Sequence, residues 1–260
     1  MRFEISEAPL SCRALTLEVP GRVLCSDFSF DVRRGECWAV VGPNGAGKTT
    51  LLATLAGLRA FERGDIAYSG SPLATLSARE MARRRGWLPQ DSVDFFPAMV
   101  IETVLVGRHP HLSRWQWESS SDIDCANKAL ADVGLAGFAR RQVASLSGGE
   151  RRRVALAALL TQDPEILLLD EPSSHLDIAH QVAMLDLIAR LARERGKTII
   201  MVLHDMHLAL RYADHAIALG SGQALADAAE SILTAESLSA LFGHPLVAIG
   251  GGNTRTIVPA

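Results

Sequence analysis

The sequence has few features of a nucleic-acid-binding, secreted or membrane-spanning protein. Its formal net charge is −3 at pH 7, so no overall positive field would hold nucleic acid or an anionic membrane non-specifically. Its four cysteines include no CxxC pair and are too sparse for a disulfide-stapled secreted domain, which favours reduced thiols in a cytosolic compartment. The longest apolar runs, such as residues 154–160, are far shorter than the roughly 20 residues of a membrane helix. We therefore expect no nucleic-acid partner, and we expect any membrane function to depend on another protein.

The length and hydrophobic content are sufficient for one substantial core. The chain has 260 residues, of which 48 % are hydrophobic, enough for a single extended domain with a smaller lobe. The N-terminal segment carries Glu4 and Glu7 and lacks the apolar centre of a signal peptide. Residues 13–41 contain short apolar stretches broken by glycine-containing turns, which predicts antiparallel strands.

A different pattern follows, in which strands alternate with helices. Residues 37–41 read as a buried strand, and residues 49–58 place four leucines, Leu58 included, on one helical face. Residues 166–169 and 198–203 read as further strands separated by an amphipathic helix. This alternation predicts an α/β fold with a mostly parallel sheet.

Residues 91–160 interrupt the alternation with helix-like segments, which predicts an inserted helical subdomain. The triple glycine that begins at Gly250 predicts a loose C-terminal segment. We expect one domain over residues 1–260, divided into a core with its antiparallel part (1–90 and 161–245), a helical subdomain (91–160) and a C-terminal tail (246–260).

Residues 42–49 match the phosphate-binding pattern GxxxxGK[ST] in full, between a predicted strand and a predicted helix. Its glycines let backbone N–H groups converge on a phosphate, and the helix N-terminus adds partial positive charge. Lys48 can reach the β- and γ-phosphate oxygens, and the Thr49 hydroxyl can bind Mg²⁺. The alternative is an ordinary glycine turn, but the chain has only three lysines, so chance seldom places one here. The predicted nucleotide-binding residues of this loop are Gly42, Pro43, Asn44, Gly45, Ala46, Gly47, Lys48, Thr49 and Thr50.

Two acids, Asp170 and Glu171, end the apolar strand at residues 166–169. Alone, such a pair is more often the start of a solvated loop. Beside a phosphate loop, however, it lies at the sheet edge where nucleotide binds, so Asp170 is predicted to hold Mg²⁺ and Glu171 to orient the attacking water.

The sequence LSGGE at residues 146–150 begins a predicted helix. Ser147 and Glu150 have the spacing of a capping box, so the simplest interpretation is a well-capped helix. Gly148 and Gly149 are costly in that role, yet they would expose N–H groups and a positive helix end to an anion. A second phosphate contact is the functional alternative.

In this order, the motifs at residues 42–49, 146–150 and 166–171 resemble the nucleotide-binding domain of ABC transporters. The resemblance covers essentially the whole chain. It implies a P-loop NTPase core with an N-terminal antiparallel β subdomain and an inserted α-helical subdomain, and it implies ATP and Mg²⁺ as cofactors. It also identifies Gln90 as the Q-loop glutamine and His204 as the H-loop histidine.

The resemblance further implies a dimer in which ATP lies between the phosphate loop of one copy and the LSGGE helix of the other. Ser147, Gly148 and Gly149 would then bind the γ-phosphate across the interface, and Asp177, in the D-loop at residues 174–177, would connect the two sites. Gln90 would sense the metal and move with a membrane partner. The implied catalytic residues are Glu171, His204, Gln90 and Lys48, and the implied metal-binding residues are Thr49, Gln90 and Asp170.

Two positions depart from the family pattern. Many members carry an aromatic residue against adenine where this chain has Glu18, Val19 and Pro20, so base recognition is expected to rest on phosphates and metal. The D-loop has His175 where small residues are frequent, and this substitution leaves Asp177 in place.

Other unusual residues are interpreted as structural. The arginine triplets at 83–85 and 151–153 are expected to be solvated helix faces or contacts to acidic partners. The two histidines of residues 109–111 have no accompanying ligand cluster that would indicate a metal site. Trp115 and Trp117 are expected to pack within the helical subdomain.

Three classes of function remain: a transport ATPase, a soluble ABC ATPase of DNA repair or translation, and an inactive nucleotide-binding regulator. Lys48, Glu171 and His204 argue against the inactive regulator, and a single cassette with a short helical region favours transport over the soluble class. The expected partners are a second copy, a permease dimer and, indirectly, an external binding protein. The expected location is the cytoplasmic face of the inner membrane, as a peripheral subunit.

Three segments, at residues 103–110, 175–181 and 233–243, resemble importers of iron chelates, heme and cobalamin. The stretch at residues 107–118 resembles the cobalamin type, with heme and ferric siderophores as alternatives. Residues 95–97, near Gln90, are expected to transmit motion to the membrane subunits.

Overall fold

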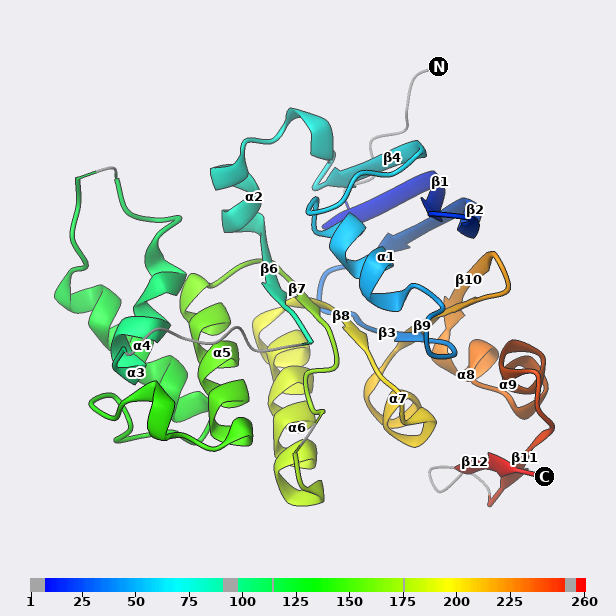
Figure 1. The fold of residues 1–260 in the computed structure, drawn as a ribbon. Coiled ribbons are helices and arrows are strands. Elements are labelled where there is room, and N and C mark those ends of the chain that lie inside the picture. The colour runs from blue at the N-terminus through cyan, green and yellow to red at the C-terminus, as the bar shows by residue number, and fades with distance from the viewer. Residues whose placement is uncertain (1–7, 91–97, 114, 175, 251–255) are drawn as a thin grey trace.

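The computed structural model describes residues 8–90, 98–113, 115–174, 176–250 and 256–260. It contains a small antiparallel sheet and a larger, mostly parallel sheet (Figure 1). The small sheet has the order β2-β1-β4-β5, and all its neighbouring strands are antiparallel. Its strands are β1 (Leu10–Val19), β2 (Arg22–Val32), β4 (Arg63–Tyr68) and β5 (Ser71–Pro72).

The larger sheet has the order β10-β9-β3-β8-β7-β6, and only β10 is antiparallel to its neighbour. The residues of β3, β7 and β8 are all buried, as expected for parallel strands covered on both faces. The strands are β3 (Cys37–Val41), β6 (Arg85–Leu88), β7 (Ile166–Leu169), β8 (Thr198–Val202), β9 (His215–Gly220) and β10 (Gln223–Ala228).

Alternating residues of this sheet enter two separate hydrophobic clusters. On β3, Trp38 and Val40 join a cluster with the small sheet and α1 (Lys48–Leu55), whereas Ala39 and Val41 join a cluster with the other helices. The period of two in a strand therefore divides the core into two layers, one on each face of the parallel sheet.

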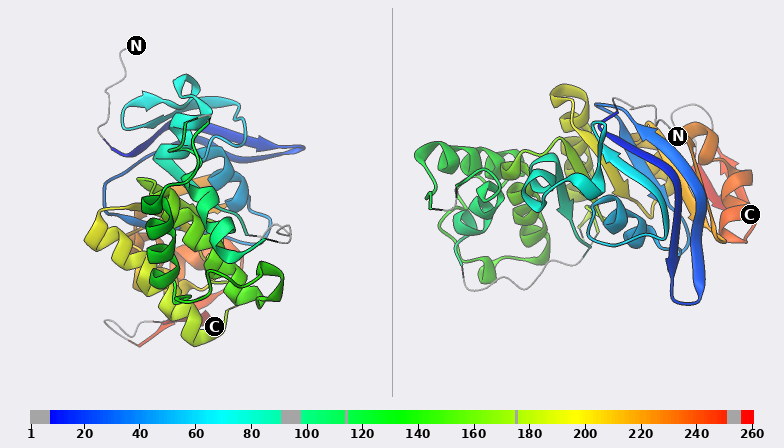
Figure 2. Two further views of the ribbon diagram at one scale, coloured as in Figure 1. Left: turned by 90° about the vertical axis from the view of Figure 1, so that its left-hand side faces the viewer. Right: turned by 90° about the horizontal axis from the view of Figure 1, so that it is seen from above.

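The helices α3, α4 and α5 follow one another between β6 and β7 and gather at the end of the molecule remote from β1 and β2 (Figures 1 and 2). The predicted fold class is therefore confirmed. No helix among the described residues combines the length and the apolar character needed to cross a bilayer. The helices after α1 are α2 (Ala78–Arg84), α3 (Val100–Leu105), α4 (Ser120–Asp132), α5 (Gly148–Gln162), α6 (Ile178–Arg195), α7 (Met206–Tyr212), α8 (Ala229–Ile232) and α9 (Ala235–Phe242).

Two details of the sequence-based prediction are wrong. Helix α1 ends at Leu55, because Gly57 adopts a positive φ of 69°, a conformation that ends helices, and Leu58 is 56 % exposed. The C-terminal segment is also more ordered than predicted, since β12 (Thr256–Pro259) pairs with β11 (Leu246–Ile249).

Candidate nucleotide-binding site

The predicted phosphate loop connects β3 to α1 and requires glycine at two positions. Gly42 has a φ of 152°, and a Cβ atom there would lie 2.1 Å from the backbone oxygen of Leu219 on β9. Gly47 has a φ of 102°, and its Cβ would lie 2.5 Å from Leu24 Cδ1. Only glycine fits such close approaches in this region of backbone conformation. The loop is therefore held tightly against β9 and β2.

Lys48, the first residue of α1, folds back over this loop. Its side chain is buried, and Nζ donates to the carbonyl oxygens of Gly42 at 2.8 Å and Pro43 at 3.0 Å. Burial lowers the pKa of Lys48, while the nearby carboxylates of Glu171 and Asp170 act in the opposite direction. The ammonium group is thus fixed at the loop by backbone acceptors.

Asp170 follows β7 and is fully buried. Neither of its carboxylate oxygens has a hydrogen-bond partner of ordinary geometry among the described residues. Burial raises the pKa of Asp170 above its usual range, and the neighbouring Thr49 side chain acts against that rise. A buried carboxylate with unused acceptor capacity beside a hydroxyl matches the hard oxygen ligands that Mg²⁺ prefers. The Thr49–Asp170 pair therefore fits a divalent cation.

Glu171 and His204 lie side by side at the same edge of the sheet. Glu171 follows β7, His204 lies just beyond β8, and these strands are parallel neighbours. His204 Nε2 is 2.5 Å from Glu171 Oε1. Glu171 is also one of the few non-glycine residues with a positive φ, 49°. A non-glycine residue rarely adopts this backbone conformation, so the surrounding structure has to hold it in place.

The predicted catalytic residues line one open cavity of ≈ 680 Å³. Lys48, Glu171, His204 and Gln90 all belong to its wall, because each follows the carboxyl end of one of four parallel strands. Other residues of its wall are Val19, Arg22, Leu24, Asn44, Gly45, Gly47, Thr49 and Thr50. Gly42, Pro43 and Ala46 are outside the wall, and Pro43 and Ala46 line a neighbouring cavity behind the loop.

The LSGGE residues lie outside this cavity. Ser147 caps α5, where its hydroxyl accepts from Glu150 N at 3.2 Å and its own N–H donates to Glu150 Oε2 at 2.7 Å. This arrangement is the predicted capping box. Ser147 and Gly148 are exposed and Gly149 is partly exposed, so the structure leaves the start of α5 open to another molecule.

Asp177 is likewise outside the cavity. It caps α6 and accepts hydrogen bonds from the backbone N–H of His180 at 2.8 Å and from its ring. These contacts, the backbone one foremost, lower the pKa of Asp177. The unusual D-loop residue His175 and the predicted coupling residues 95–97 lie outside the described residues.

The arginine triplets are less solvated than the sequence suggested, although Arg83 is exposed. Arg152 is only 5 % exposed and donates to carbonyl oxygens next to the cavity, a role that a local charge pattern does not reveal. In the other triplet, Arg84 donates to Tyr68 O and Arg85 to Ala56 O. Carbonyl groups at the ends of strands and helices lack partners within their own element. The tertiary structure brings them close to the guanidinium groups, which donate hydrogen bonds to them.

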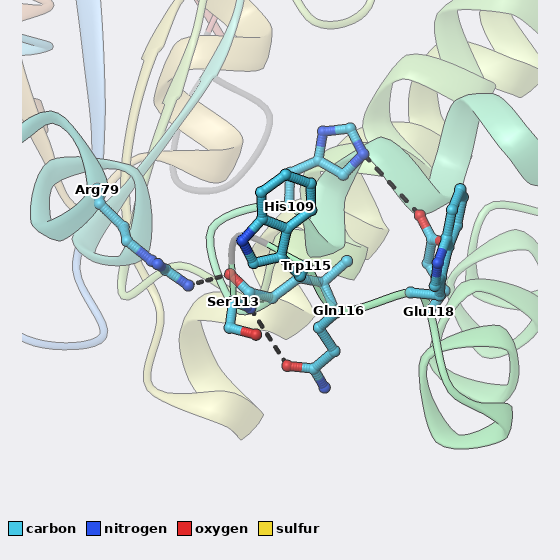
Figure 3. Close-up of a pocket in the computed structure, with 8 residues that line it drawn as sticks. Arg79, His109, Ser113, Trp115, Gln116 and Glu118 are labelled. Atoms are coloured by element: carbon cyan, nitrogen blue, oxygen red, sulfur yellow. Dashed lines mark hydrogen bonds and ion pairs between the residues drawn. The ribbon is translucent and has the colours of Figure 1, made fainter.

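The prediction that the tryptophans pack within the helical subdomain is also wrong. Trp115 is 88 % and Trp117 87 % exposed, and both line a second cavity of ≈ 480 Å³ (Figure 3). There Arg79 donates to the backbone of the loop, and His109 Nε2 lies 3.9 Å from Glu118. The loop is held by polar contacts, which leave its indole rings at the surface.

Comparisons with known proteins agree with this geometry. The family model described as ABC transporter matches residues 25–174. The hemin import ATP-binding protein HmuV of Nocardia farcinica is 42 % identical over 247 residues, covering 92 % of this chain and 84 % of the relative. The ferric enterobactin transport ATP-binding protein FepC of Escherichia coli is 38 % identical over 242 residues, covering 92 % of this chain and 88 % of the relative.

The cobalamin import ATP-binding protein BtuD of Halobacterium salinarum is 38 % identical over 242 residues, 93 % of this chain, and the match spans 60 % of that longer relative. A solved structure described as an inward-facing metal-chelate type ABC transporter superposes with a TM-score of 0.85 at 29 % identity, covering 97 % of both chains. The family model and these relatives lead to one conclusion: the chain belongs to the ABC transporter family.

Proposed function

We propose that this chain is the ATP-hydrolysing subunit of an ABC importer that works as two copies and drives uptake of a metal chelate through a membrane permease. The observation that supports this most directly is the convergence of Lys48, Glu171, His204 and Gln90 on one cavity beside the phosphate loop. Trans-membrane movement of the cargo belongs to the permease.

The phosphate loop and Lys48 bind the triphosphate. Backbone N–H groups at the start of α1 have no partner within the helix, so they can donate hydrogen bonds to phosphate oxygens. Lys48 carries its charge to the β- and γ-phosphates from a position already fixed by Gly42 and Pro43. Thr49, Asp170 and Gln90 would hold Mg²⁺, and the bound ion would neutralise negative charge on the phosphates.

Glu171 and His204 act on the γ-phosphate. Glu171 orients and polarises the attacking water, and His204 donates a hydrogen bond to the γ-phosphate. In the structure the two side chains form a hydrogen bond with each other. The imidazole therefore has to move away from the carboxylate when ATP binds and His204 contacts the γ-phosphate. This exchange frees Glu171 for water only when nucleotide is present.

A second copy completes the site. Ser147, Gly148 and Gly149 are accessible at the start of α5 and lie outside their own cavity, which supports a contact with the γ-phosphate bound by the other copy. Asp177, accessible at the start of α6, connects the two sites. Two ATP molecules are then enclosed between two copies.

A co-purification experiment tests the transport assignment. The tagged chain should be isolated from gently solubilised membranes of its source cells, with Lys48→Ala as a nucleotide-binding control. Recovery of a polytopic membrane protein supports a peripheral subunit at the cytoplasmic face of the inner membrane. Recovery from the soluble fraction with nucleic acid or ribosomes, and with no membrane protein, would instead favour the soluble class of ABC ATPases.

The proposed cargo is a cobamide, with heme and ferric siderophores as the alternatives. Similar proteins include importers named for cobalamin, hemin and ferric enterobactin, at 38 to 42 % identity, so these relatives support the chelate class. The preference within that class rests on the resemblance at residues 107–118. The cargo passes through the permease, so the permease and the external binding protein select it.

Vesicle reconstitution distinguishes these cargoes. The complex with its binding protein should accumulate labelled cobalamin in an ATP-dependent way, and Glu171→Gln should abolish the accumulation. Uptake of heme or siderophore alone would exclude the cobamide and retain the importer, whereas outward movement of substrate would exclude both.

A further inference from the structure

Arg152 lies where α5 crosses the cavity edge of the parallel sheet. Its side chain is buried, and its guanidinium donates to the carbonyl oxygens of Asp170 at 2.5 Å and Glu171 at 2.9 Å. The same group donates to the carbonyl oxygens of Gln90 at 3.1 Å and Pro89. One side chain therefore contacts the backbone of the two segments that carry the proposed water-orienting and metal-sensing residues.

This contact holds the backbone around Glu171, which has an uncommon conformation for a residue other than glycine. Glu171 has a positive φ, and Arg152 binds the carbonyl before it and the carbonyl of Glu171 itself. A guanidinium presents its donors in a fixed plane, so it can hold both carbonyls in one orientation. Without these bonds, the peptide units around Glu171 are free to turn toward a more common conformation.

The same helix begins at the exposed LSGGE segment. Arg152 lies in the second turn of α5, and Ser147 is its N-cap. A helix moves as a rigid rod over so short a distance. A displacement at the start of α5 is therefore transmitted through Arg152 to Glu171 and Gln90.

We propose that Arg152 is a positioning residue that ties the LSGGE helix to the backbone of Glu171 and Gln90, so that contact of this helix with the second copy sets the hydrolytic geometry of its own copy. The proposal rests on the proposed function, because it requires two ATP molecules enclosed between two copies. The proposal adds a connection between the two nucleotide sites, made within each subunit by the contacts of Arg152.

The neighbouring arginines are matched controls. Arg151 Nε donates to Leu146 O at 3.1 Å, just before the start of α5. Arg153 Nη1 lies 3.5 Å from the carbonyl oxygens of Val133 and Gly134, within the helical region. All three have the same charge and lie on the same helix, but the described hydrogen bonds of Arg151 and Arg153 do not reach the backbone of Glu171 or Gln90.

Steady-state kinetics of the purified full-length chain test the proposal. Arg152→Gln should lower kcat for ATP by about 10²-fold, the effect of a misplacement near 1 Å at a reacting group, while KM stays close to wild type. Arg152→Lys should recover part of kcat, because an ammonium can still bind some of the carbonyls. Arg151→Gln and Arg153→Gln should retain most of kcat. Equal kcat in Arg152→Gln and Arg151→Gln would overturn the proposal.

A dimerisation measurement separates positioning from mere folding. In a Glu171→Gln background, Arg152→Gln should still form the ATP-dependent dimer, because the LSGGE segment itself is intact. Loss of that dimer would mean that Arg152 only maintains the structure of α5, and would overturn the proposal. If Arg152→Gln does not fold, Arg152→Lys is measured in its place. Wild-type chain that neither hydrolyses ATP nor dimerises would instead contradict the proposed function.

Discussion

The imidazole Nε2 of His204 lies 2.5 Å from Oε1 of Glu171, although 33 residues separate them in the chain. The contact exists because β7 and β8 are parallel neighbours whose carboxyl ends meet at one edge of the sheet. In the proposed function Glu171 binds water and His204 binds the γ-phosphate, so this hydrogen bond competes with both contacts.

We expect Glu171→Gln to bind ATP and to hydrolyse it at least about 10²-fold more slowly, because a positioned general base contributes that much or more. Lys48, Thr49 and Asp170 remain in this variant, so binding is retained and the ATP-bound dimer accumulates. Size-exclusion chromatography with ATP and Mg²⁺ measures the dimer. Near wild-type turnover would remove Glu171 from the proposed role.

Asp170→Asn should increase the stability of the nucleotide-free protein. The same substitution should abolish the stabilisation that MgATP gives. Burial raises the pKa of Asp170, so the folded state binds this proton more tightly than the unfolded state does. The ionised group therefore costs stability, and the cost grows as pH rises from the ordinary pKa of 3.8 toward the raised one. Thermal unfolding at pH 4 and pH 7 without nucleotide measures it.

The gain in melting temperature from Asp170→Asn should be larger at pH 7 than at pH 4. MgATP should stabilise the wild type and lose this effect in the variant. An equal gain at both pH values would show that Asp170 is not held protonated more tightly in the folded state.

Gly42→Ala should destabilise the protein more than Gly45→Ala in the same loop. Both glycines have positive φ, but only a Cβ at Gly42 meets backbone, at 2.1 Å from Leu219 O, whereas Gly45 has open space. Backbone strain costs about 1–3 kcal/mol at either position, and at Gly42 the clash would also push the loop away from β9. Urea unfolding of both variants provides the comparison, and equal losses would contradict the close approach.

Base selectivity should be weak, because Val19 and Arg22 line the cavity and neither offers an aromatic face to a base. Base–aromatic stacking contributes about 1–3 kcal/mol, and its absence leaves recognition to phosphates and metal. We expect GTP to be hydrolysed at a rate comparable with ATP at matched concentrations. Val19→Tyr should lower KM for ATP, with Val19→Leu as the control, and negligible GTP hydrolysis by wild type would show that another residue reads the base.

Local sequence determined the elements that carry the chemistry. The glycine pattern around Lys48 specifies a loop that only glycine can form, the apolar run before Asp170 specifies a buried strand, and the Ser147–Glu150 spacing specifies a helix start. Each depends on backbone sterics, on strand burial or on hydrogen bonds within a few residues, so each is readable without knowledge of the rest of the chain.

The tertiary structure alone decided where the long side chains went. Arg152 is one of three consecutive arginines, and nothing in that pattern shows that it binds carbonyls of Asp170 and Gln90 while its neighbours do not. Trp115 is an apolar residue that a local pattern assigns to a core, yet the loop around it is held by polar contacts that leave it exposed. A long side chain is positioned by whichever unpaired groups the fold brings within its reach, and these groups are distant in sequence, so only the assembled sheet and helices determine its contacts.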